Sequence, residues 1–562
     1  MKVVIVGGVA GGATAAARIR RLDEQAEIIV FERSGFISYA NCGLPYYIGD
    51  VITDSEDLTL QTPESFFSRF RIHMKVHHEV ISIHPERNTV SVKDLKTGKL
   101  FEESYDNLLL APGAKAILPN NLCTDSHKVF TLRTVEDTFR IKEFVTKNKP
   151  KSAITIGGGF IGLEVAENLR NLGLDVTIVQ LTKQLLNPFD SDIASFIHNE
   201  VRKNGVKLAM GYSVESIKEN DSGVDVIMKD NLTLHADMIV LAVGVTPDST
   251  LAKEAGLALG IKENILFNEH METSIPNIYA VGDAVQTKHY VTGEDTLIAL
   301  AGPANKQGRI AADNICGGDS RYLGCQGSSI IKVFSMTAAT TGMNEKNAQL
   351  AGFKIDTAIL SPMNHAGYYP GGKLMTMKVI FEKETYRLLG AQIVGYDGVD
   401  KRIDVLATAI HGGLKATQLK DLDLAYAPPY SSAKDPINMA GFIIDNISKG
   451  LKQWHLKDLE QLPKDGSVTL LDTRTVEEYT KGHIDGFRNI PVDSLRERID
   501  EVEAGKPVYV ICQSGLRSYI ATQILEGHGF DAYNFAGGFR LYDAVMNDQI
   551  LNEKAYPCGM DE

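Results

Sequence analysis

Cysteine, tryptophan and long apolar runs are scarce in this 562-residue sequence, which has six cysteines and one tryptophan. The cysteines show no CxxC spacing, which excludes a disulfide scaffold or a cysteine-based zinc site and favours a reducing compartment. No stretch approaches the roughly eighteen uninterrupted apolar residues of a membrane span, and the N-terminal MKVVIVGG reaches its glycines after a short apolar run. We therefore expect no signal peptide, no membrane span, no metal, and a cytoplasmic protein.

Clustered positive charge is also lacking, since the formal net charge is −13. Nucleic acids and anionic membranes are bound by clustered cations, so neither is an expected partner. Local basic sites for a phosphorylated small-molecule substrate are compatible with this charge. Hydrophobic residues make up 44% of the chain, which at this length is enough for the cores of about three or four domains.

Glycine-rich turns begin two segments of the same design. Residues 2–32, KVVIVGGVAGGATAAARIRRLDEQAEIIVFE, read as a buried strand, a glycine turn, an alanine-rich helix and a second strand that ends in Glu32. Residues 152–180 repeat this order, with Gly157, Gly159 and Gly162 in G-x-G-x-x-G spacing. Free N–H groups and the dipole at each helix start can hold a pyrophosphate, so the pattern predicts two Rossmann-like nucleotide-binding units.

The first unit departs from the full pattern, because Val9 occupies the middle glycine position between Gly7 and Gly12. Glu32 nevertheless ends the second strand, where a carboxylate can accept hydrogen bonds from a ribose. Further along, IPNIYAVGDAV at 275–285 is an apolar strand that runs into a turn bearing Asp283. That carboxylate could bind a sugar-alcohol chain, and an ordinary Gly-Asp turn is the alternative interpretation.

Cys42 lies in SYANCGLPYYIGD, and the next cysteine along the chain is Cys123. An isolated cysteine of this kind is either a small buried side chain or a nucleophile whose thiolate the local structure stabilises. Ser38, Asn41 and a helix start near Gly43 could provide that stabilisation. The stretch itself leaves both interpretations open.

Cys512 ends the strand VYVI and precedes QSGLRSYIATQIL, so it stands at a strand-to-helix turn. A helix N-terminus together with a nearby arginine can lower a cysteine pKa from about 8.5 to about 3.5–7.5. Successive N–H groups of the turn can cradle an anion such as a persulfide; the turn residues are Gln513, Ser514, Gly515, Leu516 and Arg517. We predict a reactive thiol here, and a structural role for His483 in GHIDG.

Longer motifs run along nearly the whole chain: GGVAGGATAA, SYANCGLPY, GGGFIGLE, YAVGDAV, LAGPAN, HAGYYPG, AYAPPYSSAKD and CQSGLRS. With these motifs, residues 1–445 resemble the pyridine nucleotide–disulfide oxidoreductases, specifically their single-cysteine coenzyme A-disulfide reductase branch. Residues 456–545 resemble a rhodanese domain. The combination is similar to the coenzyme A-disulfide reductase/rhodanese fusions, which include NADH-dependent persulfide reductases.

The resemblance implies an α/β fold of two Rossmann-like nucleotide-binding domains, for FAD and NAD(P), plus an α+β dimerisation domain and a C-terminal α/β rhodanese domain. The expected boundaries are 1–115 with 242–322 for the FAD domain, 116–241 for the NAD(P) domain, 323–445 for dimerisation, 446–455 for a linker, 456–545 for rhodanese and 546–562 for a tail. A homodimer follows from the same resemblance. Cys558 in the tail is expected either in a disordered end or as a mobile thiol that visits an active site.

The resemblance also assigns roles to individual residues. Cys42 is implied to be the redox nucleophile beside the flavin, alternating between a thiolate and a mixed disulfide with coenzyme A, and Tyr368 and Tyr426 are implied to reach it from the partner subunit. The implied coenzyme A residues are Thr14, Arg18, Arg21, Ser38, Asn41 and Lys434, and the first three are spaced i, i+4, i+7 on a predicted helix. The implied cofactor residues are Gly7, Gly8, Gly11, Gly12, Glu32, Arg33, Val80 and Asp283 for FAD, and Gly157, Gly159, Gly162 and Gln180 for NAD(P).

Gln180 leaves the coenzyme preference open, because an acidic residue at this strand end would favour NADH and a basic one NADPH. Its amide can bond a ribose hydroxyl without repelling a 2′-phosphate, and Lys183 lies close in sequence. We expect NADH or NADPH, with a slight preference for NADH.

The expected reaction is the reduction of coenzyme A persulfide, polysulfide or coenzyme A disulfide by NAD(P)H through Cys42, which releases hydrosulfide and coenzyme A, while Cys512 handles sulfane sulfur. One alternative is an NADH oxidase or peroxidase that uses a Cys42 sulfenic acid, although Ala10 stands where such relatives usually carry a histidine. A second alternative is a protein that is primarily a sulfurtransferase. In a third, the rhodanese domain serves only as a docking module.

Overall fold

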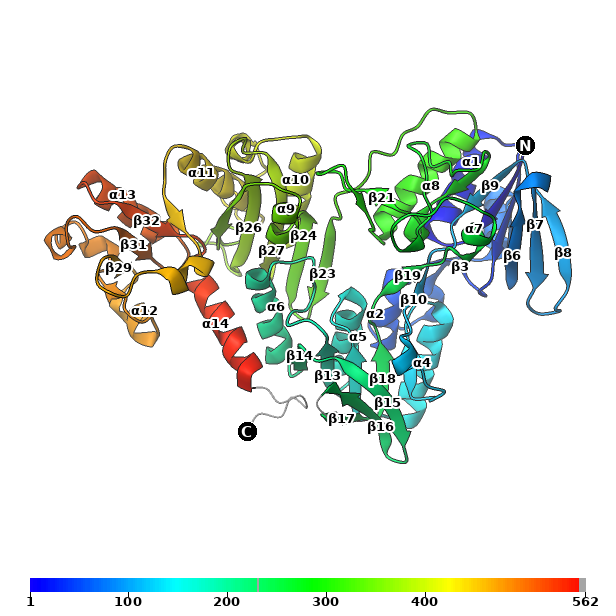
Figure 1. Ribbon diagram of the computed structural model, residues 1–562, viewed down its shortest axis with the longest axis horizontal. Coiled ribbons are helices and arrows are strands. Elements are labelled where there is room, and N and C mark those ends of the chain that lie inside the picture. The colour runs from blue at the N-terminus through cyan, green and yellow to red at the C-terminus, as the bar shows by residue number, and fades with distance from the viewer. Residues whose placement is uncertain (230–231, 555–562) are drawn as a thin grey trace. The chain divides into compact units, whose positions relative to one another are not determined.

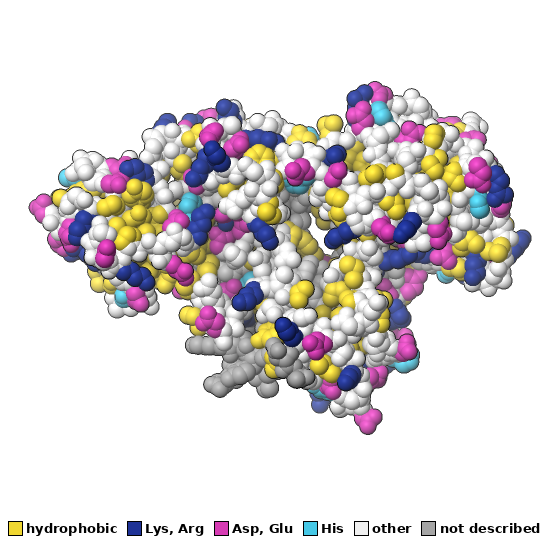
Figure 2. Space-filling model, in the orientation of Figure 1, with side chains coloured by type: hydrophobic (Ala, Val, Ile, Leu, Met, Phe, Trp, Pro, Cys, Tyr) yellow, Lys and Arg dark blue, Asp and Glu magenta, His cyan; other side chains and the backbone are white. Residues whose placement is uncertain are grey.

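The structure is a computed structural model that describes residues 1–229 and 232–554, and Figure 1 shows its helices and strands. The described chain divides into two compact units: residues 1–183 with 205–327, and residues 184–204 with 328–554. Cys558 lies outside the described residues. Within the described part, no helix is both long and apolar enough to cross a bilayer. Figure 2 shows basic and acidic side chains interspersed over the visible face.

The first unit begins with a five-stranded parallel sheet in the order β20-β9-β1-β2-β5. These strands are Ile278–Ala280, Asn107–Leu110, Lys2–Val6, Glu27–Glu32 and His73–Val76. Helix α1, Ala10–Leu22, follows β1 and packs against α8, Ala301–Ile315. The two helices approach closely because a glycine faces a glycine: a Cβ on Gly308 would lie 2.4 Å from the Gly11 carbonyl oxygen.

A second five-stranded parallel sheet repeats this arrangement in the order β11-β18-β12-β13-β14. These strands are Val129–Thr131, Met238–Leu241, Ser152–Ile156, Asp175–Gln180 and Lys207–Met210. Helix α5, Phe160–Asn171, follows β12 as α1 follows β1. The two Rossmann-like units predicted from the glycine turns are therefore confirmed.

Smaller elements complete the first unit. Three-stranded antiparallel sheets are formed by β6-β7-β8 (His78–His84, Thr89–Asp94, Leu100–Ser104) and β15-β16-β17 (Val214–Asn220, Gly223–Met228, Thr233–Ala236). Two-stranded pairs are β3-β4 (Ile37–Tyr39, Thr59–Gln61), β10-β19 (Ala114–Ala116, Val245–Pro247) and β21-β22 (Thr287–Lys288, Asp295–Thr296). The remaining α-helices are α2 (Leu44–Ile48), α3 (Pro63–Phe70), α4 (Val135–Asn148) and α7 (Thr250–Glu254).

The second unit contains an antiparallel sheet in the order β23-β24-β27-β26-β25. Its strands are Ser329–Val333, Met336–Gly342, Leu388–Gly395, Met375–Glu382 and Ile355–Leu360. The helices around it are α6 (Ser191–Lys203), α9 (Glu345–Leu350), α10 (Val399–His411) and α11 (Pro436–Ser448). Strand β27 is buried along its whole length, as expected for a central strand covered on both faces.

A parallel sheet in the order β28-β32-β31-β29-β30 forms the C-terminal part of the second unit. Its strands are Gln453–Trp454, Ala532–Phe535, Val508–Ile511, Thr469–Asp472 and Arg488–Asn489. The accompanying helices are α12 (Val476–Lys481), α13 (Leu516–Gly527) and α14 (Gly538–Lys554). Residues 546–554, which the sequence placed in a tail, thus continue α14.

Helix α14 is fastened to α6 by a buried polar group. The Leu185 N–H donates to His198 Nε2 at 3.0 Å, so the imidazole proton lies on Nδ1, which bonds Asp548 Oδ2 at 2.8 Å. Arg202 Nη1 donates to the other carboxylate oxygen at 2.6 Å. Because His198 is 1% exposed and Asp548 7% exposed, these bonds are shielded from water.

We expect Asp548→Asn to loosen α14, because it removes the negative charge opposite Arg202. Local opening should become roughly tenfold more frequent, equivalent to about 1.4 kcal/mol. Limited proteolysis followed by mass spectrometry measures this as faster cleavage within α14. Asp543→Asn, which changes an exposed carboxylate on the same helix, is the matched control; equal cleavage of the two variants would contradict the expectation.

Candidate functional site

The first glycine turn has no room for side chains. Gly7 has a φ of +98°, and a Cβ there would lie 2.1 Å from the Ala111 carbonyl oxygen. A Cβ on Gly12 would lie 1.9 Å from the Gly7 carbonyl oxygen. The Glu32 carboxylate, 8% exposed, accepts hydrogen bonds from the Gly8 and Ser34 N–H groups at 2.9 Å. Turn, helix start and acceptor therefore meet at one sheet edge, as dinucleotide binding requires.

The second glycine turn reproduces these features. Gly157 has a φ of +113°, and a Cβ on Gly162 would lie 1.9 Å from the Gly157 carbonyl oxygen. A Cβ on Gly159 would meet nothing within 4 Å, so this turn leaves open space above the start of α5. Gln180 Oε1 accepts from the Gly158 N–H at 2.9 Å, the counterpart of the bond between Glu32 and Gly8. Both cradles therefore fit a dinucleotide, with a carboxylate in the first and a neutral amide in the second.

Of the other residues implied for FAD, the two charged ones lie in ion pairs and the apolar one lies in the core. Asp283 pairs with Arg133 Nη2 at 2.6 Å. Arg33 pairs with Asp248 at 2.7 Å. Val80 is 5% exposed and belongs to the apolar core behind the first sheet, and a Cβ on Gly11 would lie 2.9 Å from the Val281 side chain.

Cys42 lies in a short turn, Asn41–Gly43, directly before α2. Ser38, in the strand β3 that leads into this segment, has a φ of 45°, and its N–H donates to the Gly8 carbonyl oxygen at 2.8 Å. The segment that carries Cys42 is thereby tied to the first glycine turn by its backbone. The thiol itself is exposed.

The surroundings of Cys42 favour the protonated thiol, whereas one of the two sequence interpretations was a locally stabilised thiolate. Partial burial raises the pKa of the Cys42 thiol, the Glu164 carboxylate raises it further, and Arg133 acts in the opposite direction. Glu164 comes from α5, and burial raises the pKa of this carboxyl to about 7. Sequence reasoning missed Glu164 and Arg133, because neither is near Cys42 along the chain.

Two of the three side chains predicted to bind coenzyme A on α1 already have side-chain partners. Arg18 Nε donates to Asp313 on α8 at 2.7 Å, and Thr14 Oγ1 donates to Asn305 Oδ1 at 2.6 Å. Arg21 is exposed and has no ion-pair partner among residues 1–229 and 232–554. The neighbouring Arg20, in contrast, is buried and donates to backbone carbonyls, so its role is structural.

The second unit brings the two predicted tyrosines together. Tyr368 Oη and Tyr426 Oη are 2.6 Å apart, and both side chains are exposed. Arg402, which is 1% exposed, links the two loops that carry these tyrosines. Its Nη2 donates to the Asn364 carbonyl oxygen and to Asp435, both at 2.9 Å. Lys434 is exposed beside this ion pair. Sequence reasoning missed Arg402, because nothing in its helix marks it as a link between loops.

Cys512 lies at the end of β31 and is fully buried. Its Sγ accepts hydrogen bonds from the Gly515 N–H at 3.1 Å and from Ser518 Oγ at 3.2 Å. Gly538 closes the loop from behind, since a Cβ there would lie 2.7 Å from the Gln513 backbone. The sulfur is thus held by one turn N–H and one hydroxyl, and Ser518 is a donor that the sequence interpretation did not include.

Arg517 and His483 are directed to partners other than the thiol. The Arg517 guanidinium makes two 2.7 Å bonds to Glu478, and these bonds lower the pKa of Glu478 to about 2. His483 stacks on Tyr479 with ring centroids 4.0 Å apart. Leu516, at the rim of the loop, is exposed.

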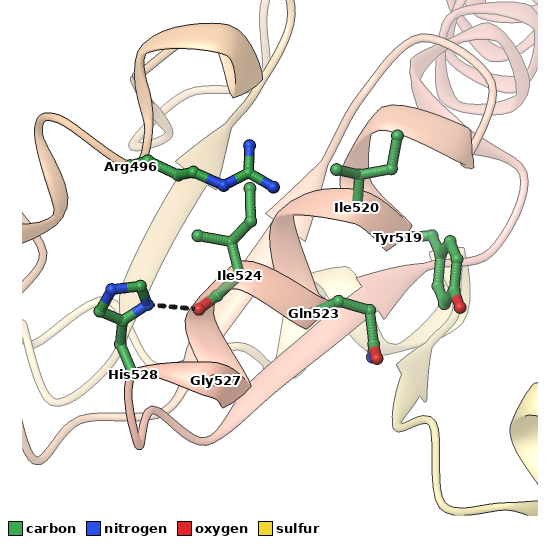
Figure 3. Close-up of a pocket in the computed structure, with 7 residues that line it drawn as sticks. All are labelled: Arg496, Tyr519, Ile520, Gln523, Ile524, Gly527 and His528. Carbon is green, nitrogen blue, oxygen red and sulfur yellow. Dashed lines mark hydrogen bonds between the residues drawn. The ribbon is translucent and has the colours of Figure 1, made fainter.

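A surface groove of about 430 Å³ runs along the same helix, α13 (Figure 3). Its lining residues are Arg496, Tyr519, Ile520, Gln523, Ile524, Gly527 and His528, and His528 Nδ1 bonds the Ile524 carbonyl oxygen at 2.8 Å. Neither Cys512 nor its loop lines this groove. In the described ranges, no group of three histidine, cysteine, aspartate or glutamate side chains is placed to hold a metal ion.

Comparison with known proteins identifies the class. Residues 1–308 match the pyridine nucleotide-disulphide oxidoreductase family, residues 328–436 match its dimerisation domain, and residues 455–544 match the rhodanese-like domain. The chain belongs to the pyridine nucleotide-disulphide oxidoreductase family and is an oxidoreductase. FAD and NAD(H) are the cofactors of this family, in agreement with the two glycine cradles.

Particular relatives extend the similarity over most of the chain. The coenzyme A disulfide reductase of Staphylococcus epidermidis is 40% identical over 442 residues, which cover 78% of this chain and 99% of the relative. The structure of reduced Bacillus anthracis CoADR-RHD matches with a TM-score of 0.94 and 45% identity, covering 97% of this chain and 98% of that one. A NAD-dependent persulfide reductase from A. fulgidus matches with a TM-score of 0.90 and 36% identity, covering 96% and 100%.

We expect Glu164→Gln to make Cys42 more reactive above pH 7, because it removes an anion that raises the thiol pKa. Alkylation of Cys42 at pH 8 should be roughly threefold to tenfold faster than in the wild type. Below pH 6, where Glu164 is largely protonated, the difference should disappear. Timed iodoacetamide labelling of the reduced holoenzyme, read by peptide mass spectrometry, measures this; Glu143→Gln, at an exposed carboxylate of α4, is the control.

Proposed function

We propose that this chain reduces coenzyme A persulfide and coenzyme A disulfide with electrons from NAD(P)H through Cys42, and that Cys512 handles sulfane sulfur. The observation that supports this most directly is the pair of dissimilar thiols. Cys42 is exposed and has no second cysteine in its loop, whereas Cys512 is buried in a cradle of hydrogen-bond donors. A thiol without an internal partner needs the substrate's sulfur to complete a disulfide.

Reaction at Cys42 follows from that requirement. The Cys42 thiolate attacks the coenzyme A sulfur of the persulfide, so that a Cys42–coenzyme A disulfide forms, the persulfide bond breaks and hydrosulfide leaves. Coenzyme A disulfide gives the same mixed disulfide and releases coenzyme A thiolate. FAD, when bound, supplies the two-electron chemistry between nicotinamide and disulfide.

The residues around the thiol control its proton. Burial and the Glu164 carboxylate raise the pKa of Cys42 and so favour its thiol form, and Arg133 is the group that favours the thiolate. We assign Tyr368 and Tyr426 to the same site in the partner subunit of a homodimer, which the dimerisation domain would form. A phenol O–H there can protonate the departing coenzyme A thiolate.

We assign coenzyme A and the nicotinamide coenzyme to side chains of α1, the Cys42 segment, the second tyrosine loop and the second glycine turn. Arg21 is free to meet a phosphate, while Arg18 must share its guanidinium with Asp313. Ser38, Asn41 and Lys434 are assigned to the remainder of the substrate. The neutral Gln180 amide tolerates a 2′-phosphate as well as a ribose hydroxyl, so both NADH and NADPH are proposed as reductants.

The proposal is tested by anaerobic NADH oxidation with coenzyme A persulfide, coenzyme A disulfide and hydrogen peroxide as separate oxidants, while hydrosulfide is followed. Turnover with the persulfide and one hydrosulfide released per NADH is the expected result. Turnover with peroxide alone would instead indicate an oxidase or peroxidase. Fast sulfur transfer without NADH, and no reduction of either coenzyme A substrate, would indicate a sulfurtransferase.

Cys42→Ser should retain bound flavin but lose NADH-dependent reduction of both coenzyme A substrates by about 10³-fold or more, because the attacking thiolate is absent. Flavin absorbance and stopped-flow NADH oxidation measure the two properties. Cys123→Ser removes another exposed thiol of the same unit and should leave the rate unchanged. Persulfide reduction at the wild-type rate in Cys42→Ser would refute the assignment.

A further inference from the structure

The loop that carries Cys512 has one cation, Arg517, and that cation is closed in an ion pair. Arg517 Nη1 and Nη2 donate to Glu478 Oε2 and Oε1, both at 2.7 Å. Two parallel charge-assisted hydrogen bonds fix the guanidinium in one orientation relative to the carboxylate. The guanidinium is therefore committed to Glu478, and the thiol receives its hydrogen bonds from Gly515 and Ser518 instead.

Glu478 is itself held in place by the start of α12. The Thr475 N–H donates to Glu478 Oε2 at 2.9 Å, and the Glu478 N–H donates to Thr475 Oγ1 at 3.2 Å, which together form a capping box. The carboxylate cannot turn away from Arg517 without uncapping the helix. The ion pair is thus preorganised.

Three other charged side chains near the loop also have partners of their own. Arg474 pairs with Asp472 at 2.7 Å, and both side chains are almost completely buried. Glu477, on the outer side of α12, pairs with Lys481 at 2.6 Å. Arg540, at the start of α14, donates to Thr376 Oγ1 at 3.2 Å, and its guanidinium lies over the Phe196 ring, 5.3 Å from the ring centroid. The donors that bond the Cys512 sulfur, the Gly515 N–H and the Ser518 hydroxyl, are both neutral.

We propose that Glu478 is a specificity-determining residue of the Cys512 site: by holding Arg517 in a closed ion pair, it keeps the cradle neutral and selects a persulfide carried by a thiol such as coenzyme A over the dianion thiosulfate. Thiosulfate brings two negative charges to the sulfur that must approach the Cys512 thiolate, and without a free cation this repulsion is uncompensated. A persulfide brings at most one charge there.

The same sulfur transfer is possible from either donor. The Cys512 thiolate forms a bond to the outer sulfur of the donor while the donor's S–S bond breaks. From a persulfide the leaving group is the donor thiolate, and from thiosulfate it is sulfite. In both cases Cys512 becomes a persulfide and no outside oxidant or reductant is required.

The test compares donors in the full-length protein without NADH. The rate at which Cys512 becomes persulfidated is measured by peptide mass spectrometry with thiosulfate and with coenzyme A persulfide. Glu478→Gln should raise the ratio of the thiosulfate rate to the persulfide rate by roughly tenfold, and this gain should decrease at high salt, because Arg517 is then free to attract the dianion. Glu477→Gln makes the same charge change on the same helix, away from Arg517, and should keep the wild-type ratio.

Two further measurements separate specificity from a merely structural role. Alkylation of Cys512 at a fixed pH should be faster in Glu478→Gln than in the wild type, because the released cation stabilises the thiolate. The double variant Glu478→Gln/Arg517→Gln should return to the wild-type donor ratio, because it restores neutrality. An equal loss with both donors, or an unchanged ratio and alkylation rate, would overturn the inference.

The inference rests on the proposed role of Cys512 in sulfur transfer. The experiment distinguishes failure of that role from failure of the specificity assignment. If the wild-type protein transferred sulfur to Cys512 from neither donor, the proposed role would fail. If wild-type transfer occurred but Glu478→Gln and Glu477→Gln gave the same donor ratio, only the specificity assignment would fail.

Discussion

Both nucleotide cradles depend on one steric constraint, the contact between the helix start and the turn that precedes it. A Cβ on Gly12 or Gly162 would lie 1.9 Å from the carbonyl oxygen of Gly7 or Gly157, so a side chain at either position would separate strand from helix. With glycine there, the helix N–H groups point at the sheet edge where a pyrophosphate binds. The Cys42 segment is anchored to the same edge through the bond from the Ser38 N–H to the Gly8 carbonyl oxygen.

In the described residues, the arginine near each of the two thiols is already paired: Arg133 with Asp283, and Arg517 with Glu478. Burial and the Glu164 carboxylate raise the pKa of Cys42, with Arg133 as a partial counterweight, and Cys512 accepts hydrogen bonds from neutral donors. Thiolate character governs unwanted oxidation as well as useful reactivity.

The second unit joins its parts through buried, closed polar groups. Arg402 ties the two tyrosine loops to each other, and Asp548 ties α14 to His198 and Arg202 of α6. Since α14 begins directly behind the Cys512 loop, one rigid helix runs from that loop to α6. Such groups are costly to break, so they hold loops in position more firmly than surface ion pairs would.

The amino-acid sequence by itself determined the features that depend on local spacing: the two glycine turns, the strands they follow, and the strand-loop-helix that presents Cys512. Through the resemblance of its motifs it also predicted roles for Cys42 and for the two tyrosines, which the structure brings within 2.6 Å of each other. Only the tertiary structure decided which charges are available, because Arg18 meets Asp313 and Arg517 meets Glu478 across long stretches of chain. Spacing along a helix places a side chain on a face, but the partner it meets there is set by whichever distant segment packs against that face.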